Sequence, residues 1–165
     1  MALLGSARAA AQVSEYAVKA AFVYKFSEFV EWPPGSFKSQ DSPINICVLG
    51  ENPFGNSLEQ ITRGKTFAGR AFAVKLVQEP GQIPACQILF ISRSEKRRLG
   101  AVLASLGKSA VLTIGDTEGF AERGVMIDLF LDGNKVRFEI NPGAAARAGL
   151  QISSKLLSLA KIISG

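Results

Sequence analysis

The feature that most constrains the fold is a series of short apolar runs separated by helical patterns. The run at residues 86–91, Cys-Gln-Ile-Leu-Phe-Ile, is almost entirely apolar, as expected of a strand that is covered on both faces. Similar runs occupy residues 44–49, 72–77 and 110–114, and a helical pattern over residues 95–106 precedes the last of them. Because such alternation is typical of parallel strands joined by helices, it predicts an α/β fold.

Both ends of the chain complete this prediction. A helix is predicted over residues 14–31, with Ser14 as its N-cap and Pro33 just beyond its end. Near the C-terminus, the turn sequence Asp132-Gly133-Asn134 joins two strand patterns and predicts an antiparallel hairpin. We therefore expect a mostly parallel sheet of about six strands with helices on both faces and a C-terminal antiparallel hairpin, a Rossmann-like three-layer α/β fold.

The length of 165 residues suits a single domain, which we expect to span residues 13–165. Residues 1–12 are small and apolar and include Ala7-Arg8-Ala9, which has the spacing of a signal-peptide cleavage site. They are interpreted as a signal-peptide remnant or a flexible tail. No window reaches the roughly 18–20 continuous apolar residues of a membrane span, so direct membrane insertion is not expected.

The residue types that most enzymes and metal sites need are scarce. The sequence contains no histidine, and its two cysteines, Cys47 and Cys86, lie in no metal-binding spacing. Ser105 and Lys108 have the spacing of a Ser-Lys pair, but Gly107 interrupts the helix between them. No catalytic residue, metal or cofactor is predicted, and a binding protein is favoured over an enzyme.

The loop after the first apolar run, residues 50–57, has the glycine spacing of a phosphate-binding loop. Asn56 stands where that loop has its lysine, Pro53 removes a backbone N–H, and Glu51 would repel an anion. A tight turn from strand to helix is therefore the better interpretation.

Charged residues leave several interpretations open. The formal net charge is +5, but the densest basic cluster, residues 93–98, has no aromatic platform beside it, so a solvated helix end is favoured over nucleic-acid binding. Four acids follow the strand at 110–114 and could line an acid–base or cation site, although helix caps or solvated groups are the favoured interpretation. They are Asp116, Glu118, Glu122 and Asp128.

The predicted hairpin carries Arg137 and Glu139 on one face and apolar residues on the other. The two charges are interpreted either as an ion pair on a solvated face or as part of a surface for a protein partner. The residues predicted to form that partner-binding surface are Ile127, Arg137, Glu139 and Asn141.

Eight segments, in order and spacing, resemble the YfiR/HmsC-like family of small exported bacterial proteins over roughly residues 16–160. They are residues 21–33 (AFVYKFSEFVEWP), 46–55 (ICVLGENPFG), 64–70 (GKTFAGR), 86–92 (CQILFIS), 111–116 (VLTIGD), 119–121 (GFA), 136–141 (VRFEIN) and 149–157 (GLQISSKLL).

This resemblance implies a periplasmic regulator that binds the periplasmic sensor region of a membrane-bound diguanylate cyclase and represses it. Such repression lowers cyclic-di-GMP and biofilm formation. The resemblance also implies a homodimer, a disulfide between Cys47 and Cys86, and no catalytic motif. An alternative function is a periplasmic small-molecule sensor whose ligand binds near the ends of the parallel strands; the two functions are compatible.

Overall fold

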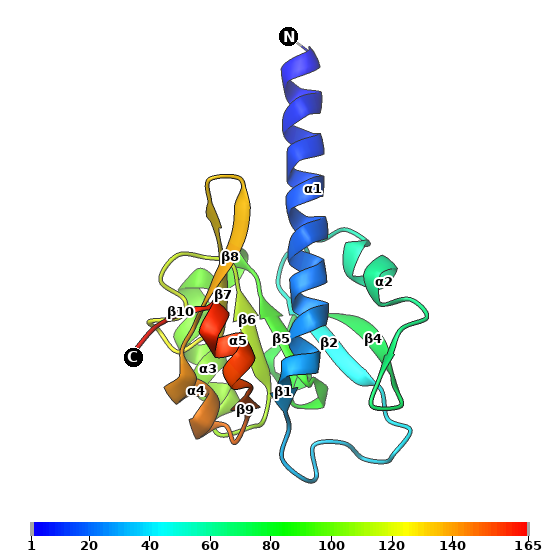
Figure 1. Ribbon diagram of the computed structural model, residues 1–165, viewed down its shortest axis with the longest axis vertical. Coiled ribbons are helices and arrows are strands. Elements are labelled where there is room, and N and C mark those ends of the chain that lie inside the picture. The colour runs from blue at the N-terminus through cyan, green and yellow to red at the C-terminus, as the bar shows by residue number, and fades with distance from the viewer. Residues whose placement is uncertain (1, 165) are drawn as a thin grey trace.

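An eight-stranded sheet forms the centre of the computed structural model, which describes residues 2–164 (Figure 1). Its strands lie in the order β10-β8-β7-β6-β5-β2-β4-β3. Their bounds are β2 Ile44–Leu49, β3 Thr66–Phe67, β4 Arg70–Val77, β5 Ile88–Ile91, β6 Leu112–Gly115, β7 Ile127–Asp132, β8 Lys135–Ile140 and β10 Lys161–Ile162.

Strands β4, β2, β5, β6 and β7 are parallel to one another, β3 is antiparallel to β4, and β7 and β8 form the expected antiparallel hairpin. The predicted fold class is thus confirmed. The expected number of strands was too small because the edge strands β3 and β10 contain two residues each, too few for a sequence pattern. A further pair, β1 (Val30–Glu31) and β9 (Gln151–Ile152), forms a separate antiparallel ladder.

Helices cover both faces of the sheet, as predicted. Alternate residues of β5 point to opposite sides: Ile88 and Phe90 belong to the core shared with the N-terminal helix, whereas Leu89 and Ile91 pack with the helix that follows β5. The α-helices are α1 Ala2–Phe26, α2 Ser57–Thr62, α3 Leu99–Leu106, α4 Pro142–Arg147 and α5 Ser154–Leu159, and the 3₁₀ helices are η1 Ser27–Phe29, η2 Pro80–Ala85 and η3 Arg93–Arg98.

The N-terminal helix differs from its prediction at both ends. Helix α1 begins at Ala2, so Ser14 lies within the helix and is not its N-cap. The added residues are rich in alanine, which has the highest helix propensity. At the other end Val30 belongs to β1, where it pairs with Ile152, a distant contact that local periodicity does not reveal. Met1 lies outside the described residues, and the origin of residues 2–12 in a signal peptide stays a prediction.

The disulfide implied by the family resemblance is present between Cys47 and Cys86. Cys47 lies within β2, and Cys86 lies just before β5, the strand that pairs with β2. Both cysteines are buried in the core on the α3 side of the sheet. The bond therefore ties two neighbouring strands together from within.

Candidate functional site

A pocket opens where β6 ends and the hairpin continues beyond it. Strand β6 pairs only with the first two residues of β7, whereas β7 pairs with β8 over six residues, so the hairpin projects past the sheet (Figure 1). The space of about 690 Å³ beside it has the size of a small-molecule site. We call it the acidic pocket; its lining includes Glu15, Tyr16, Lys19, Arg93, Asp116, Glu118, Glu122, Asp128, Phe130, Glu139 and Lys161.

On the α1 wall of this pocket, the charges are paired. The ammonium group of Lys19 lies 2.6 Å from a carboxylate oxygen of Glu15 and 3.0 Å from one of Asp116. The same oxygen of Asp116 accepts a hydrogen bond of 2.7 Å from the hydroxyl of Tyr16. Burial and this carboxylate raise the pKa of Tyr16 well above its ordinary value, so the hydroxyl stays a donor. These contacts hold α1 against the end of β6.

On the hairpin wall, two carboxylates face each other. Asp128 and Glu139 occupy directly opposite positions of the β7–β8 ladder, and only 2% and 9% of their surfaces are exposed. Asp128 accepts one hydrogen bond of 3.2 Å, from the backbone N–H of Thr117. The carboxylate of Glu139 has no hydrogen bond or ion pair among the side chains and backbone groups that the structure describes. Like charges in this arrangement repel each other strongly.

The environment therefore favours the protonated forms of both acids. Burial, followed by the charge of Glu139, raises the pKa of Asp128 to about 8. Burial, followed by the charge of Glu122, also raises the pKa of Glu139, and the ammonium group of Lys161 partly offsets this. At neutral pH, Asp128 is therefore mostly neutral.

The structure brings together the four acids that follow β6 and adds Glu139 to them. The favoured interpretation, helix caps or solvated groups, was wrong for Asp116 and Asp128, whose side chains are almost fully buried. The register of the hairpin, counted back from Asp132 and Lys135, places Asp128 opposite Glu139 and could have revealed the pair. Among the described residues, no group of three or more acids or cysteines is placed to hold a metal ion.

The four predicted partner-binding residues have different positions. Ile127 is buried in the core, and Asn141 is buried at the start of α4, where its side chain accepts from the N–H of Ala144. These two side chains therefore stabilise the interior and present no surface to a partner. Arg137 is exposed, and its ion pair is with Asp132, at 3.1 Å, rather than with Glu139, which faces the acidic pocket.

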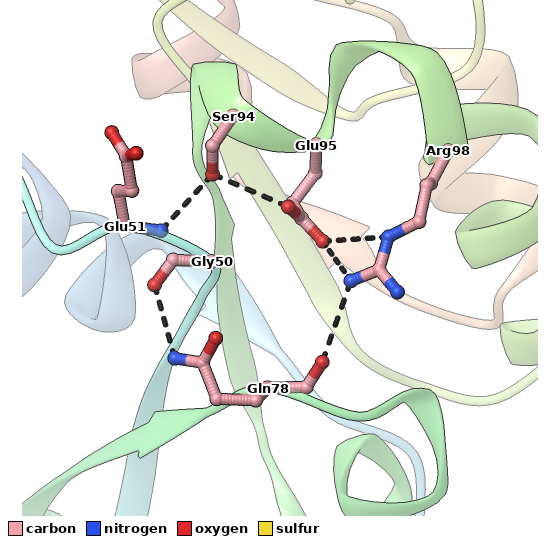
Figure 2. A network of polar contacts seen from close by, with 6 residues as sticks. All are labelled: Gly50, Glu51, Gln78, Ser94, Glu95 and Arg98. Carbon is pink, nitrogen blue, oxygen red and sulfur yellow. Dashed lines mark hydrogen bonds and ion pairs between the residues drawn. The ribbon is translucent and has the colours of Figure 1, made fainter.

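A second polar cluster, which we call the closed corner, lies at the ends of β2 and β4 (Figure 2). The carboxylate of Glu95, 7% exposed, accepts hydrogen bonds from the guanidinium of Arg98 and the hydroxyl of Ser94. Arg98 also donates to the carbonyl of Gln78, whose side-chain amide donates to the carbonyl of Gly50. The cluster joins η3 to both strand ends.

Gly50 explains why the loop at residues 50–57 is not a phosphate site. Its backbone has φ of +91°, and a Cβ there would lie 2.4 Å from Oγ of Ser94 and 2.9 Å from Cγ of Glu95. The inside of the turn is thus filled by the chain itself, with a carboxylate nearby. The prediction of a tight strand-to-helix turn is confirmed. The basic cluster at 93–98 is not wholly solvated, because Glu95 is buried in it.

An apolar groove of about 490 Å³ lies on the other side of the hairpin, between α1, β8 and α5. Phe138 of β8 packs there against Phe22 and Phe26 of α1, with ring centroids 5.9 Å and 5.1 Å apart. The exposed side chains of Val18 and Leu159 extend its apolar surface. Sequence reasoning missed this groove, because its walls come from three separate segments.

The fold resembles solved structures of distant sequence. A Streptococcus pneumoniae ABC domain in complex with L-Trp matches with a TM-score of 0.50 and 15% identity, over 72% of this chain and 55% of that one. A conserved domain protein from Vibrio cholerae O1 biovar El Tor matches with a TM-score of 0.54 and 12% identity, over 72% and 54%. This chain spans about half of each, and the likeness concerns the fold alone.

None of the helices within residues 2–164 combines the length and apolar character needed to cross a membrane. The model of one protein family matches residues 16–161, which is nearly the whole chain. That family is regulatory and non-catalytic, and at the level of the family it supports a periplasmic regulator of cyclic-di-GMP signalling. The chain belongs to the YfiR/HmsC-like family.

Proposed function

We propose that this protein is a periplasmic repressor that binds the periplasmic sensor region of a membrane-bound diguanylate cyclase. By holding the cyclase inactive it lowers cyclic-di-GMP and biofilm formation, and it does so without catalysis. The observation that carries this proposal is the family match over residues 16–161. We further propose that the protein acts as a homodimer.

The projecting hairpin is the surface that best suits such a partner. Leu131, near its tip, is 48% exposed, and the solvent-exposed ion pair between Arg137 and Asp132 lies on the opposite face of the two strands. Protein-binding surfaces combine exposed apolar side chains with charged groups, and the hairpin offers both, one on each face. Of the residues predicted from the sequence to bind a partner, this surface includes Arg137. It does not include Ile127 and Asn141, which are buried, and it adds Leu131.

The test is a pull-down from solubilised membranes with the wild-type protein and a Leu131→Asp variant. We expect the wild type to recover a membrane protein that carries a cyclase domain, and the variant to recover at least tenfold less. Leu76→Asp is the matched control, because Leu76 is also an exposed leucine (56%) but lies on β4, far from the hairpin in the strand order. Recovery of cytosolic proteins alone, or equal losses in both variants, would contradict the proposal.

A second candidate function is a small-molecule sensor, and the acidic pocket favours it. The pocket lies at the carboxyl ends of parallel strands, where α/β sheets commonly bind ligands. Because Glu139 lines the pocket from the strand that carries Arg137, a ligand there could change the hairpin that we propose for the partner. Native mass spectrometry of the purified protein tests this function: a retained small molecule supports it.

A further inference from the structure

The inference concerns the ligand of the acidic pocket, and it rests on the second candidate function rather than on the repressor proposal. Its starting point is Glu139, which is nine-tenths buried and lines the pocket, and whose carboxylate has no hydrogen bond or ion pair among the described residues. Its carboxylate oxygens are not among the fully buried side-chain atoms that lack a hydrogen-bond partner, so they stay open to the pocket, where a positively charged ligand group would pair with them.

The balance of charge around the pocket also points to a cation. Six acids and three bases line it, which leaves an excess of three negative charges when all are ionised. Of the bases, Lys19 is already paired with Glu15 and Asp116, whereas Arg93 and Lys161 are exposed. Of the acids that line the pocket, the buried ones without an ion pair are therefore Asp128 and Glu139.

The lining favours an organic cation over a metal ion. The described residues contain no group of three acids or cysteines placed to hold a metal, and the pocket is much larger than one ion. Phe130 contributes aromatic surface to its wall, whereas the ring of Tyr16 already has the ammonium group of Lys19 at 4.6 Å from its centroid. Aromatic faces and carboxylates together are the surroundings in which proteins bind alkylammonium groups.

We propose that the acidic pocket binds a small organic cation whose ammonium group lies between Asp128 and Glu139. Binding is coupled to a proton: the positive ligand favours the ionised carboxyl, so the proton at this pair leaves when the ligand binds. The groups that set this balance are Asp116, Glu118 and Glu122 after β6, Lys161 on β10, Arg93 on η3, and Glu15, Tyr16 and Lys19 on α1.

The experiment is an NMR titration of the full chain with butylammonium chloride, with sodium butyrate and calcium chloride as comparison ligands. We expect saturable shifts around residues 128 and 139 with butylammonium, and at least tenfold weaker binding at pH 6 than at pH 8. Glu139→Gln and Asp128→Asn should each weaken binding at least tenfold. Asp132→Asn, an acid on the same hairpin outside the pocket, should leave it unchanged.

Several results would overturn this proposal. They are saturable binding of butyrate or calcium in place of butylammonium, wild-type affinity in both pocket variants, and shifts that never saturate. The spectra of the free variants show whether each is folded, and since Gln and Asn keep the shape of the side chains, a folded variant is expected. None of these results bears on the pull-down, so the repressor proposal stands or falls separately.

Discussion

The closed corner and the acidic pocket both lie where strands of the sheet end, and each contains a glutamate of nearly equal burial, Glu95 at 7% and Glu139 at 9%. Glu95 accepts hydrogen bonds from Arg98 and Ser94, whereas Glu139 has no such partner among the described residues. Burial alone therefore does not distinguish a structural acid from one that is open to a ligand. The presence of hydrogen-bond donors beside the carboxylate distinguishes the two.

The difference has a local cause. Arg98 follows Glu95 by three residues in one helical turn, so the sequence itself places the counter-charge. The neighbours of Glu139 come from other strands: Asp128 stands opposite on β7, and Lys161 on β10 occupies the paired position but keeps its ammonium group in solvent. In the closed corner, a nearby residue in the sequence pairs with the glutamate, whereas in the acidic pocket the neighbours come from other strands and leave the glutamate unpaired.

The largest effect is expected from a substitution of Gly50 in the closed corner. Gly50→Ala combines a positive φ with overlap against Ser94 and Glu95, so we expect the free energy of unfolding to fall by about 2–4 kcal/mol. Urea denaturation followed by circular dichroism measures it. The matched control is Gly55→Ala, at φ of +57° with no atom within 4 Å of the added Cβ, which should cost about 1 kcal/mol. Equal losses would mean that the corner is not tightly packed.

The next effect contrasts the two glutamates directly. Glu95→Gln removes the ionised acceptor of the closed corner and should lower the free energy of unfolding by about 1–2 kcal/mol. Glu139→Gln removes a buried charge that repels Asp128, so it should leave stability unchanged or raise it at pH 8. The same denaturation experiment measures both. A loss of stability in Glu139→Gln as large as that in Glu95→Gln would remove the contrast.

The last effect is a dependence on pH. Asp128 has a pKa of about 8 in the folded protein, above that of an exposed aspartate, so the folded state holds a proton that the unfolded state loses. Its contribution to stability is full below about pH 4 and is lost as pH rises through 8. Asp128→Asn should flatten this decline and be more stable than the wild type at pH 9. Parallel curves of thermal midpoint against pH would contradict it.

What the sequence could predict depended on how local each signal was. The strand at residues 44–49 was located to the residue, because the apolar run marks both of its ends. Strand β10 was missed, since two residues of pairing show no period. The site was half predictable: the acids after β6 are visible in the sequence, but the burial of Asp128 and Glu139 depends on α1 and β10, which only the tertiary structure brings near.

The bond between Cys47 and Cys86 makes the folded state depend on the compartment. It closes a loop with a sequence separation of 39, and limiting the unfolded chain in this way stabilises the folded state by about 4 kcal/mol. Small domains have a total stability of about 5–15 kcal/mol. The folded state would thus be only marginally stable where thiols are kept reduced and stable where they are oxidised. The redox potential of its surroundings would therefore determine whether the protein is folded and able to bind.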